Sequence, residues 1–199
     1  MAEDDHLIAS IPDVDYRKQP RRRITRKKRV VSRPTTPRFR PPRWFVIVHS
    51  DGGHRASRWI AAWGAVVKDG QRRILIEAAG ALTEDGVTSN EAEYIGMMEG
   101  IRIAHEFSPL ARIHVYADSL LVVQQMTGNW VCRSPVLRKL RDKALAYIDS
   151  EAIDVDFFWV PRGENKDADR MCNEMMDAAL SLREVDPYEQ PKPIYRRVG

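Results

Sequence analysis

The sequence predicts one α/β domain with a five-stranded mixed sheet, in the element order βββαβαβα, and with helices on both faces of the sheet. Short apolar runs of strand type alternate with longer segments in which apolar residues recur every three or four positions. Strands that alternate with helical segments are typical of a sheet that contains parallel pairs. A chain of 199 residues, 43% of them hydrophobic, is long enough for one such domain with tails.

The first three strands are predicted to follow one another as a meander. Residues 45–48 are apolar on both faces, as in a strand covered on both sides of a sheet. Residues 63–68 and 73–78 flank Asp69-Gly70, a signal for a hairpin with a two-residue turn. We therefore expect three neighbouring strands before the first helix.

The spacing of apolar residues changes to that of a helix after Gly86, which indicates the first helix. Thr88, Ser89 and Asn90 are candidate caps at its start, and Pro109 closes it. The later elements are a strand at 113–118, a helix from near Ser119, a helix at 134–150, a strand at 155–160 and a last helix at 168–183.

The basic residues are concentrated in the first 43 positions. This segment holds 13 of the 32 basic and 5 of the 28 acidic side chains, a net charge of +8, whereas the remainder has a net charge of −4. We expect a disordered arm at 1–43, a folded domain at 44–183 and a flexible tail at 184–199. Three roles are open for the arm: it would bind the phosphate backbone of nucleic acid, act as a nuclear localisation signal, or coat RNA without specificity. Its basic cluster consists of Arg21, Arg22, Arg23, Arg26, Lys27, Lys28 and Arg29.

The sequence argues against a membrane protein or a secreted protein. It contains no run of 18 uninterrupted apolar residues, and its N-terminus lacks the order of charges and apolar residues that marks a secretory signal. Cys132 and Cys172 lie far apart and form no CxxC pair, so neither a disulfide framework nor a zinc knuckle is indicated. We expect an intracellular protein in a reducing compartment.

Four carboxylates occur at the ends of predicted elements. Asp51 ends the first strand, Glu93 lies in the first turn of the first helix, Asp118 ends the fourth strand and Asp169 lies in the first turn of the last helix. If the first and fourth strands are parallel neighbours, Asp51 and Asp118 emerge at the same rim of the sheet. Two carboxylates about 4 Å apart repel by roughly 4 kcal/mol at an effective dielectric near 20, so such a cluster needs cations or raised pKa values. A set of oxygen ligands favours Mg²⁺ or Mn²⁺ over zinc.

Each carboxylate taken alone has an ordinary structural explanation. Asp51 precedes two glycines and would suit a turn, and Glu93 would complete a capping box with Asn90. Thr88 and Glu91 offer the same box in another register, two residues earlier, which leaves Glu93 free. Only the joint occurrence of all four at element ends favours a shared site.

Four segments that contain these carboxylates resemble the type 1 ribonuclease H family, and the similarity covers residues 44–182. The resemblance implies a ribonuclease H-like fold and an endonuclease that hydrolyses the RNA strand of RNA–DNA hybrids, leaving 5′-phosphate and 3′-hydroxyl ends, with two Mg²⁺ or Mn²⁺ ions. The segments are His49-Ser-Asp-Gly-Gly, Thr88-Ser-Asn-Glu-Ala-Glu-Tyr, Val115-Tyr-Ala-Asp-Ser and Val160-Pro-Arg-Gly-Glu-Asn-Lys-Asp-Ala-Asp.

The resemblance also implies a role for each residue. Asp51 would bridge both ions, Asp169 would help hold the ion that activates water, and Glu93 and Asp118 would hold the ion facing the leaving oxygen. Asn90 matches a family position that contacts the hybrid in its minor groove. The residues implied in substrate binding are Gly52, Asn90, Ser119, Arg162 and Asn165.

The sequence departs from the family in two places. Arg162 stands in the loop where many members have a histidine, and arginine cannot act as a general base because it stays charged. Residues 54–59 replace the usual glycine-rich turn. An alternative class is therefore open: a non-catalytic RNA-binding or structural component of a ribonucleoprotein. We expect a monomer, or a subunit of a ribonucleoprotein or replication complex, that binds a hybrid or another nucleic acid.

Overall fold

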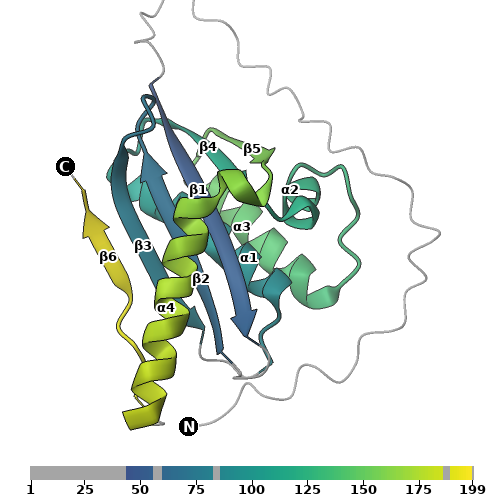
Figure 1. Ribbon diagram of the computed structural model, residues 1–199. Helices are drawn as coiled ribbons and strands as arrows, with labels where there is room; N and C mark the ends of the chain where they lie inside the picture. Colours follow the sequence, from purple (N-terminus) through teal and green to yellow (C-terminus); the bar gives the residue numbers. More distant parts are fainter. Residues whose placement is uncertain (1–43, 56–59, 83–85, 186–188, 199) are drawn as a thin grey trace, which may run out of the picture. The chain divides into compact units, whose positions relative to one another are not determined.

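The computed structural model describes residues 44–55, 60–82, 86–185 and 189–198, so the predicted arm at 1–43 lies outside the described residues. One mixed sheet contains six strands in the order β5-β4-β1-β2-β3-β6 (Figure 1). The strands are β1 (Phe45–Arg55), β2 (Ile60–Lys68), β3 (Ile74–Leu82), β4 (Arg112–Ala117), β5 (Val155–Trp159) and β6 (Ile194–Arg197). The helices are α1 (Ser89–Phe107), α2 (Leu120–Met126), α3 (Pro135–Ser150) and α4 (Lys166–Val185), with a short 3-10 helix, η3 (Arg162–Glu164).

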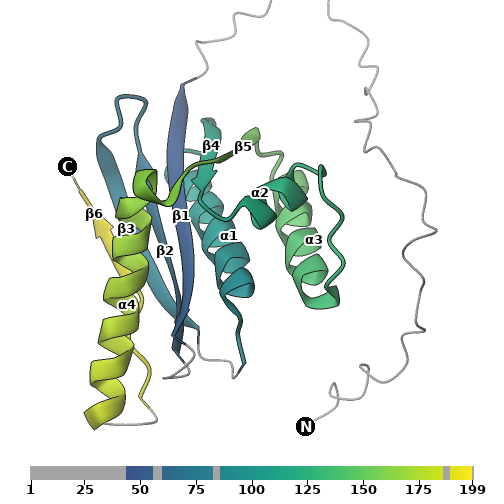
Figure 2. The ribbon, with the colours of Figure 1, turned by 45° about the vertical axis from the view of Figure 1, so that its right-hand side comes forward.

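Helices cover both faces of the sheet, as predicted. Figure 2 shows α4 on one side and α1, α2 and α3 on the other. On the first side, Val66 of β2 is fully buried in a cluster with Met171 and Met175 of α4. On the second side, Val48 of β1 and Ile113 of β4 belong to a larger cluster that also contains residues of α1, α2 and α3. None of the helices in the described ranges is long and apolar enough to cross a bilayer.

Local capping fixes the start of each helix on the second face. The side chain of Thr88 accepts a hydrogen bond from the backbone of Glu91, and the Glu91 side chain accepts one from the backbone of Thr88. Ser119 caps α2, and Ser134 caps α3 with Pro135 in its first turn. These residues act on neighbours within one turn, which explains why the predicted starts agree with the structure.

The parallel pairing of β1 and β4 confirms the predicted neighbourhood of the first and fourth strands. Ser50 is in register with Ala117, so Asp51 and Asp118 both follow the last parallel pair. The connection between these strands runs through the predicted first helix, α1. The structure corrects the predicted end of the first strand, because Asp51 lies within β1, in register with Gly64 of β2, and β1 runs on to Arg55. Two acidic residues that are remote in the chain nevertheless become neighbours where the pairing of β1 with β4 ends.

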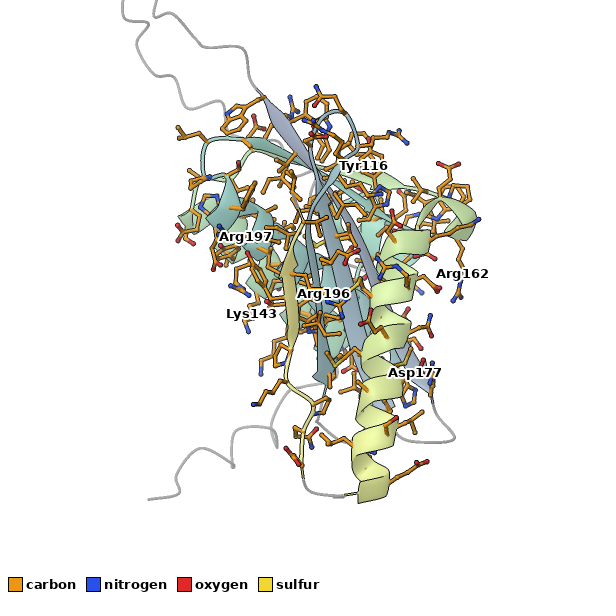
Figure 3. All side chains as sticks on the ribbon, turned by 60° about the vertical axis from the view of Figure 1, so that its left-hand side comes forward. Tyr116, Lys143, Arg162, Asp177, Arg196 and Arg197 are labelled. Carbon is orange, nitrogen blue, oxygen red and sulfur yellow. The ribbon has the colours of Figure 1, made fainter. Side chains whose placement is uncertain are left out.

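The structure corrects the predicted number of strands. The segment 184–199, expected as a flexible tail, contains the end of α4 and a sixth strand, β6, which pairs antiparallel with β3. The strand covers the backbone groups that an edge strand would otherwise expose. Arg196 of β6, which is labelled in Figure 3, also forms ion pairs with Glu77 of β3 and Glu174 of α4, and these pairs join the strand to the sheet and the helix.

The turn between β2 and β3 is also longer than predicted. The hairpin is present, but its loop runs from Asp69 to Arg73 rather than through two residues. The Asp69 carboxylate accepts hydrogen bonds from the backbone N–H groups of Gln71 and Arg73, each at 2.9 Å, and Arg72 adopts a φ of 65°. Side-chain bonding by aspartate stabilises this wider loop.

Candidate active site

Three of the four predicted carboxylates converge beside the inner strands β1 and β4, at the point where β4 ends. One oxygen from each of Asp51, Glu93 and Asp118 lies within 4.8 Å of the others. They come from β1, from the first turns of α1 and from the end of β4. The arrangement gathers residues from three separate elements into a set of oxygen ligands suited to a hard divalent cation.

Close packing of α1 on β1 places Glu93 beside Asp51. A Cβ atom on Gly52 would lie 2.1 Å from the backbone C of Ala92 and from the backbone N of Glu93. A Cβ atom on Gly96 would lie 2.5 Å from the backbone O of Asp51. The two glycines therefore allow strand and helix to approach so closely that their carboxylates meet.

Burial and the repulsion of neighbouring charges make Asp51 and Glu93 hard to ionise without a cation. Burial, followed by the negative charges of Asp118 and Asp169, raises the pKa of Asp51 to about 6. Burial, followed by the charges of Asp51 and Asp118, raises the pKa of Glu93 to about 9. The Oε2 atom of Glu93 is buried and has no hydrogen-bond partner. A metal ion would supply both the missing partner and the missing charge, so the residues fit such an ion.

Asp169, the fourth predicted carboxylate, adjoins this group but is held by other partners. Its charge helps to raise the pKa of Asp51. Its Oδ1 atom accepts a hydrogen bond of 2.6 Å from Arg162, and its Oδ2 atom accepts one of 3.2 Å from Asn173. Figure 3 labels Arg162 near the N-terminal end of α4, where its side chain is 77% exposed. An exposed cation thus neutralises Asp169 at the rim of the site.

The structure corrects the role of Asn165, which was expected to bind substrate. Its side chain is 0% exposed and therefore cannot contact a substrate in this conformation. Its Nδ2 atom donates to Oδ1 of Asp118 and to the backbone O of Ser50, both at 2.9 Å. Asn165 acts on the site indirectly, by holding Asp118.

The other predicted substrate residues lie around the site in different settings. Asn90 is exposed in the first turn of α1, and Arg162 is exposed beside Asp169. Gly52 is buried against α1, where it permits close packing, and its expected contact with substrate stays a prediction. Ser119 is half-buried and its hydroxyl caps α2, accepting from the backbone of Val122 at 3.5 Å. Asn90 and Arg162 are therefore the residues of this set most accessible to a ligand.

Sequence reasoning missed two residues that contact the candidate ligands or their partners. His49 lies 3.2 Å from Asn165, and Asn173 bonds Asp169. Asn173 follows Asp169 by one helical turn, and this spacing was a signal that could have been used. No sequence signal connects His49 with Asn165, because 116 residues separate them.

Comparison with known proteins agrees with this fold and site. Residues 49–175 match the model of the family described as Reverse transcriptase-like. The "Bifunctional protein Rv2228c" of Mycobacterium tuberculosis is 37% identical over 142 residues, which are 71% of this chain and 38% of that protein. This chain therefore spans less than two fifths of the mycobacterial relatives that it matches.

Solved structures of ribonucleases H cover the same part of the chain. The N-terminal RNase H domain of Rv2228c from Mycobacterium tuberculosis, solved as a fusion with maltose-binding protein, has a TM-score of 0.62 and 36% identity over 70% of this chain and 98% of that chain. RNase H1 of Halobacterium salinarum has a TM-score of 0.61 and 32% identity, over 66% and 97%. LC11-RNase H1, solved in complex with an RNA/DNA hybrid, has a TM-score of 0.63 and 29% identity, over 68% and 99%.

The mixed sheet, with carboxylates that converge beside its inner strands β1 and β4, defines a ribonuclease H-like domain. This assignment agrees with the matched family and with the solved relatives. The chain belongs to the ribonuclease H family, and its structural neighbours are type 1 ribonuclease H domains.

Proposed function

We propose that this protein is a metal-dependent endonuclease that hydrolyses the RNA strand of RNA–DNA hybrids and leaves 5′-phosphate ends. One observation carries the proposal: Asp51, Glu93 and Asp118 converge within 4.8 Å, and the Glu93 oxygen is buried without a partner. Family membership adds the substrate class, since a relative of 29% identity was solved with an RNA/DNA hybrid.

In this proposal, Asp51, Glu93 and Asp118 hold one Mg²⁺ or Mn²⁺ ion, and Asp51 and Asp169 hold a second. Divalent ions in such sites lower the pKa of bound water and stabilise the entering and leaving oxygens of a phosphodiester. The chain itself contributes a fixed geometry, because β1, α1 and β4 pack rigidly around the carboxylates. Arg162 carries a permanent positive charge at the rim, where it can contact a phosphate once an ion takes its place at Oδ1 of Asp169.

The selection of an RNA strand is assigned to the exposed start of α1. Asn90 lies in the first turn of α1, one turn before Glu93, with its side chain open to solvent. An amide at this point can donate to and accept from a 2′-hydroxyl group, which distinguishes RNA from DNA in a minor groove.

A cleavage assay tests the proposal directly. The full chain, with Mg²⁺, is offered a labelled hybrid, single-stranded RNA, double-stranded RNA and double-stranded DNA of the same sequence. We expect cleavage of the hybrid alone, and at least about a 10³-fold slower reaction for Asp118→Asn, equivalent to about 4 kcal/mol. Asp142→Asn is the matched control, because Asp142 is an exposed aspartate on α3 that pairs with Arg141 and does not belong to the carboxylate group.

Equal product from the wild-type chain and Asp118→Asn would exclude this site as the origin of cleavage. A wild-type chain that binds the hybrid but yields no product with either Mg²⁺ or Mn²⁺ would instead support the alternative class, a non-catalytic RNA-binding component.

The basic arm is proposed to strengthen binding to nucleic acid without reading its sequence. It carries 13 of the 32 basic residues and lies outside the described residues. Deletion of residues 1–43 is expected to weaken hybrid binding. It should also reduce the magnitude of the slope of log affinity against log salt concentration by roughly 3–6, because fewer counterions are released. Fluorescence anisotropy at several salt concentrations measures both quantities. An unchanged slope would remove this role from the arm.

A further inference from the structure

A buried amide joins β1 to Asp118. Both N–H groups of Asn165 are used, because its Nδ2 atom donates to Asp118 Oδ1 and to the backbone O of Ser50, each at 2.9 Å. Its Oδ1 atom must therefore accept a hydrogen bond. The Nδ1 atom of His49 lies 3.2 Å from this oxygen, so His49 is the donor. We call this series of hydrogen bonds a relay. In it, a donor on β1 (His49) bonds the amide of Asn165, and this amide bonds the carboxylate of Asp118.

The same order of donor, amide and carboxylate occurs a second time beside Asp169. The Nη2 atom of Arg55, at the end of β1, donates to Oδ1 of Asn173 at 3.2 Å. Asn173 then donates from Nδ2 to the backbone O and to Oδ2 of Asp169, at 2.9 Å and 3.2 Å. Arg55 is itself held by an ion pair with Asp177, which Figure 3 labels farther along α4.

We propose that His49 and Arg55 are positioning residues that act through the two asparagines to orient Asp118 and Asp169 for metal binding. A free carboxylate loses rotational freedom when it binds an ion, and this loss weakens binding. A carboxylate held by an amide has lost that freedom before the ion arrives. The part of the inference that concerns catalysis rests on the proposed nuclease function, whereas the part that concerns metal affinity does not.

A purely structural role for His49 is the rival explanation. Its ring stacks on Tyr116 with centroids 5.4 Å apart and an interplanar angle of 17°. Tyr116 stacks in turn on Phe158, with centroids 4.9 Å apart. Replacement of His49 could therefore act through lost stacking rather than through the lost hydrogen bond. The test has to separate the ring from its donor.

Three substitutions of His49 make this separation. His49→Phe keeps an aromatic ring but removes the donor. His49→Asn loses the ring but places an N–H donor at the same number of bonds from the backbone as Nδ1, whereas His49→Gln places it one bond farther away. If the hydrogen bond matters, the Asn variant retains function and the other two lose it. The comparison of Asn with Gln remains decisive if the Phe variant fails to fold.

The primary measurement is Mn²⁺ binding to the full chain by calorimetry, without nucleic acid. We expect His49→Phe and His49→Gln to raise the Kd for Mn²⁺ by about three- to tenfold, and His49→Asn to stay within about twofold of the wild type. In hybrid cleavage, the half-saturating Mg²⁺ concentration should rise by the same factor. The KM for the hybrid should change by less than about twofold, because His49 and Asn165 are proposed to act on Asp118 and not on the substrate.

Double substitutions test whether each pair acts as one relay. His49→Phe should have no further effect on Mn²⁺ affinity in an Asn165→Ala chain, and Arg55→Met should have none in an Asn173→Ala chain. Arg55→Met alone is expected to weaken Mn²⁺ binding by about two- to fivefold, less than His49→Phe, because Arg55 is partly exposed.

The inference is overturned if His49→Asn binds Mn²⁺ as weakly as His49→Phe, or if neither His49→Phe nor His49→Gln alters the Mn²⁺ affinity. It is also overturned if the two substitutions of a pair change the Mn²⁺ affinity independently, so that the double variant shows the product of the two single changes. A wild-type chain that binds neither Mn²⁺ nor Mg²⁺ would also overturn it. A wild-type chain that binds Mn²⁺ but cleaves no hybrid would refute the proposed function alone, and the relays would still be judged by the metal affinities.

Discussion

Replacement of Glu93 by glutamine is expected to abolish hybrid cleavage and to stabilise the metal-free protein at pH 8. Glutamine keeps the shape of the side chain but removes the charge that a metal ion requires. Cleavage should fall by at least about 10³-fold, equivalent to about 4 kcal/mol of transition-state stabilisation. The same charge is unfavourable without a metal, because Glu93 Oε2 is buried, has no partner and faces Asp51 and Asp118. Function and stability are thus expected to change in opposite directions.

The pH dependence follows from the raised pKa of Glu93. An unfolded glutamate ionises near pH 4.5, whereas burial and two neighbouring carboxylates raise the pKa of folded Glu93 to about 9. The folded chain therefore holds this proton more tightly, and the stability that it contributes is fully present below pH 4.5 and is lost as the pH rises to about 9. Asp51, with a pKa raised from 3.8 to about 6, adds the same trend over a lower range.

Urea unfolding in EDTA at pH 5 and pH 8 measures this effect. Glu93→Gln should reduce the loss of stability between the two pH values and should gain about 1–2 kcal/mol at pH 8. Glu106→Gln is the matched control, because Glu106 lies on the same helix, is 60% exposed and forms an ion pair with Arg102. Cleavage at the wild-type rate, or lower stability of Glu93→Gln at pH 8, would contradict the prediction.

Replacement of Gly52 by alanine is expected to have the largest effect on folding. The new Cβ atom would lie 2.1 Å from the backbone C of Ala92 and from the backbone N of Glu93. Neither atom can rotate away, so α1 must move off β1. Such overpacking typically costs about 1–3 kcal/mol, and we expect a loss at the upper end or beyond, about 3 kcal/mol or more. The displacement also separates Glu93 from Asp51, so Mg²⁺-dependent cleavage should be lost even where the chain remains folded.

Gly163→Ala is the control for this substitution. A Cβ atom on Gly163 would meet no atom within 4 Å, and the residue lies in an exposed turn of η3. The free energy of unfolding of the Gly163→Ala variant should stay within about 0.5 kcal/mol of that of the wild type. Urea denaturation of both variants gives the comparison, and equal stability of Gly52→Ala and Gly163→Ala would refute the close-packing argument.

The elements that could be predicted from the sequence depend on short-range interactions. Thr88 and Glu91 form a capping box within one helical turn, and Ser134 caps α3 through Leu137, three residues later. The spacing of apolar residues is an equally local signal, because it depends on which side of a single helix or strand faces the core. The strand β6 could not be found in this way, because its four residues are stabilised by β3 and by ion pairs with Glu77 and Glu174.

In the candidate site, too, the sequence revealed what depends on residue type and position but not what depends on contacts between distant residues. The carboxylates were recognisable because four acidic residues on or beside buried elements are unusual enough, taken together, to indicate a shared site, although Asp51 lies within β1 and not at its end. The distinction between ligands and their supports was not recognisable. Asn165 stands in a motif with Asp169, and only its burial and its bonds to Ser50 and Asp118 show that it supports a carboxylate.

The sequence by itself determined the order of the elements as far as the last helix, the starts of the capped helices and the four acidic positions, because each depends on residue type and on neighbours within a few positions. Only the tertiary structure decided which carboxylates meet, how closely α1 approaches β1 and which side chains hold the ligands in place. These features depend on contacts such as that between His49 and Asn165, which lie 116 residues apart. Distances of this kind are set by the packing of the whole sheet and its helices, and no local pattern encodes them.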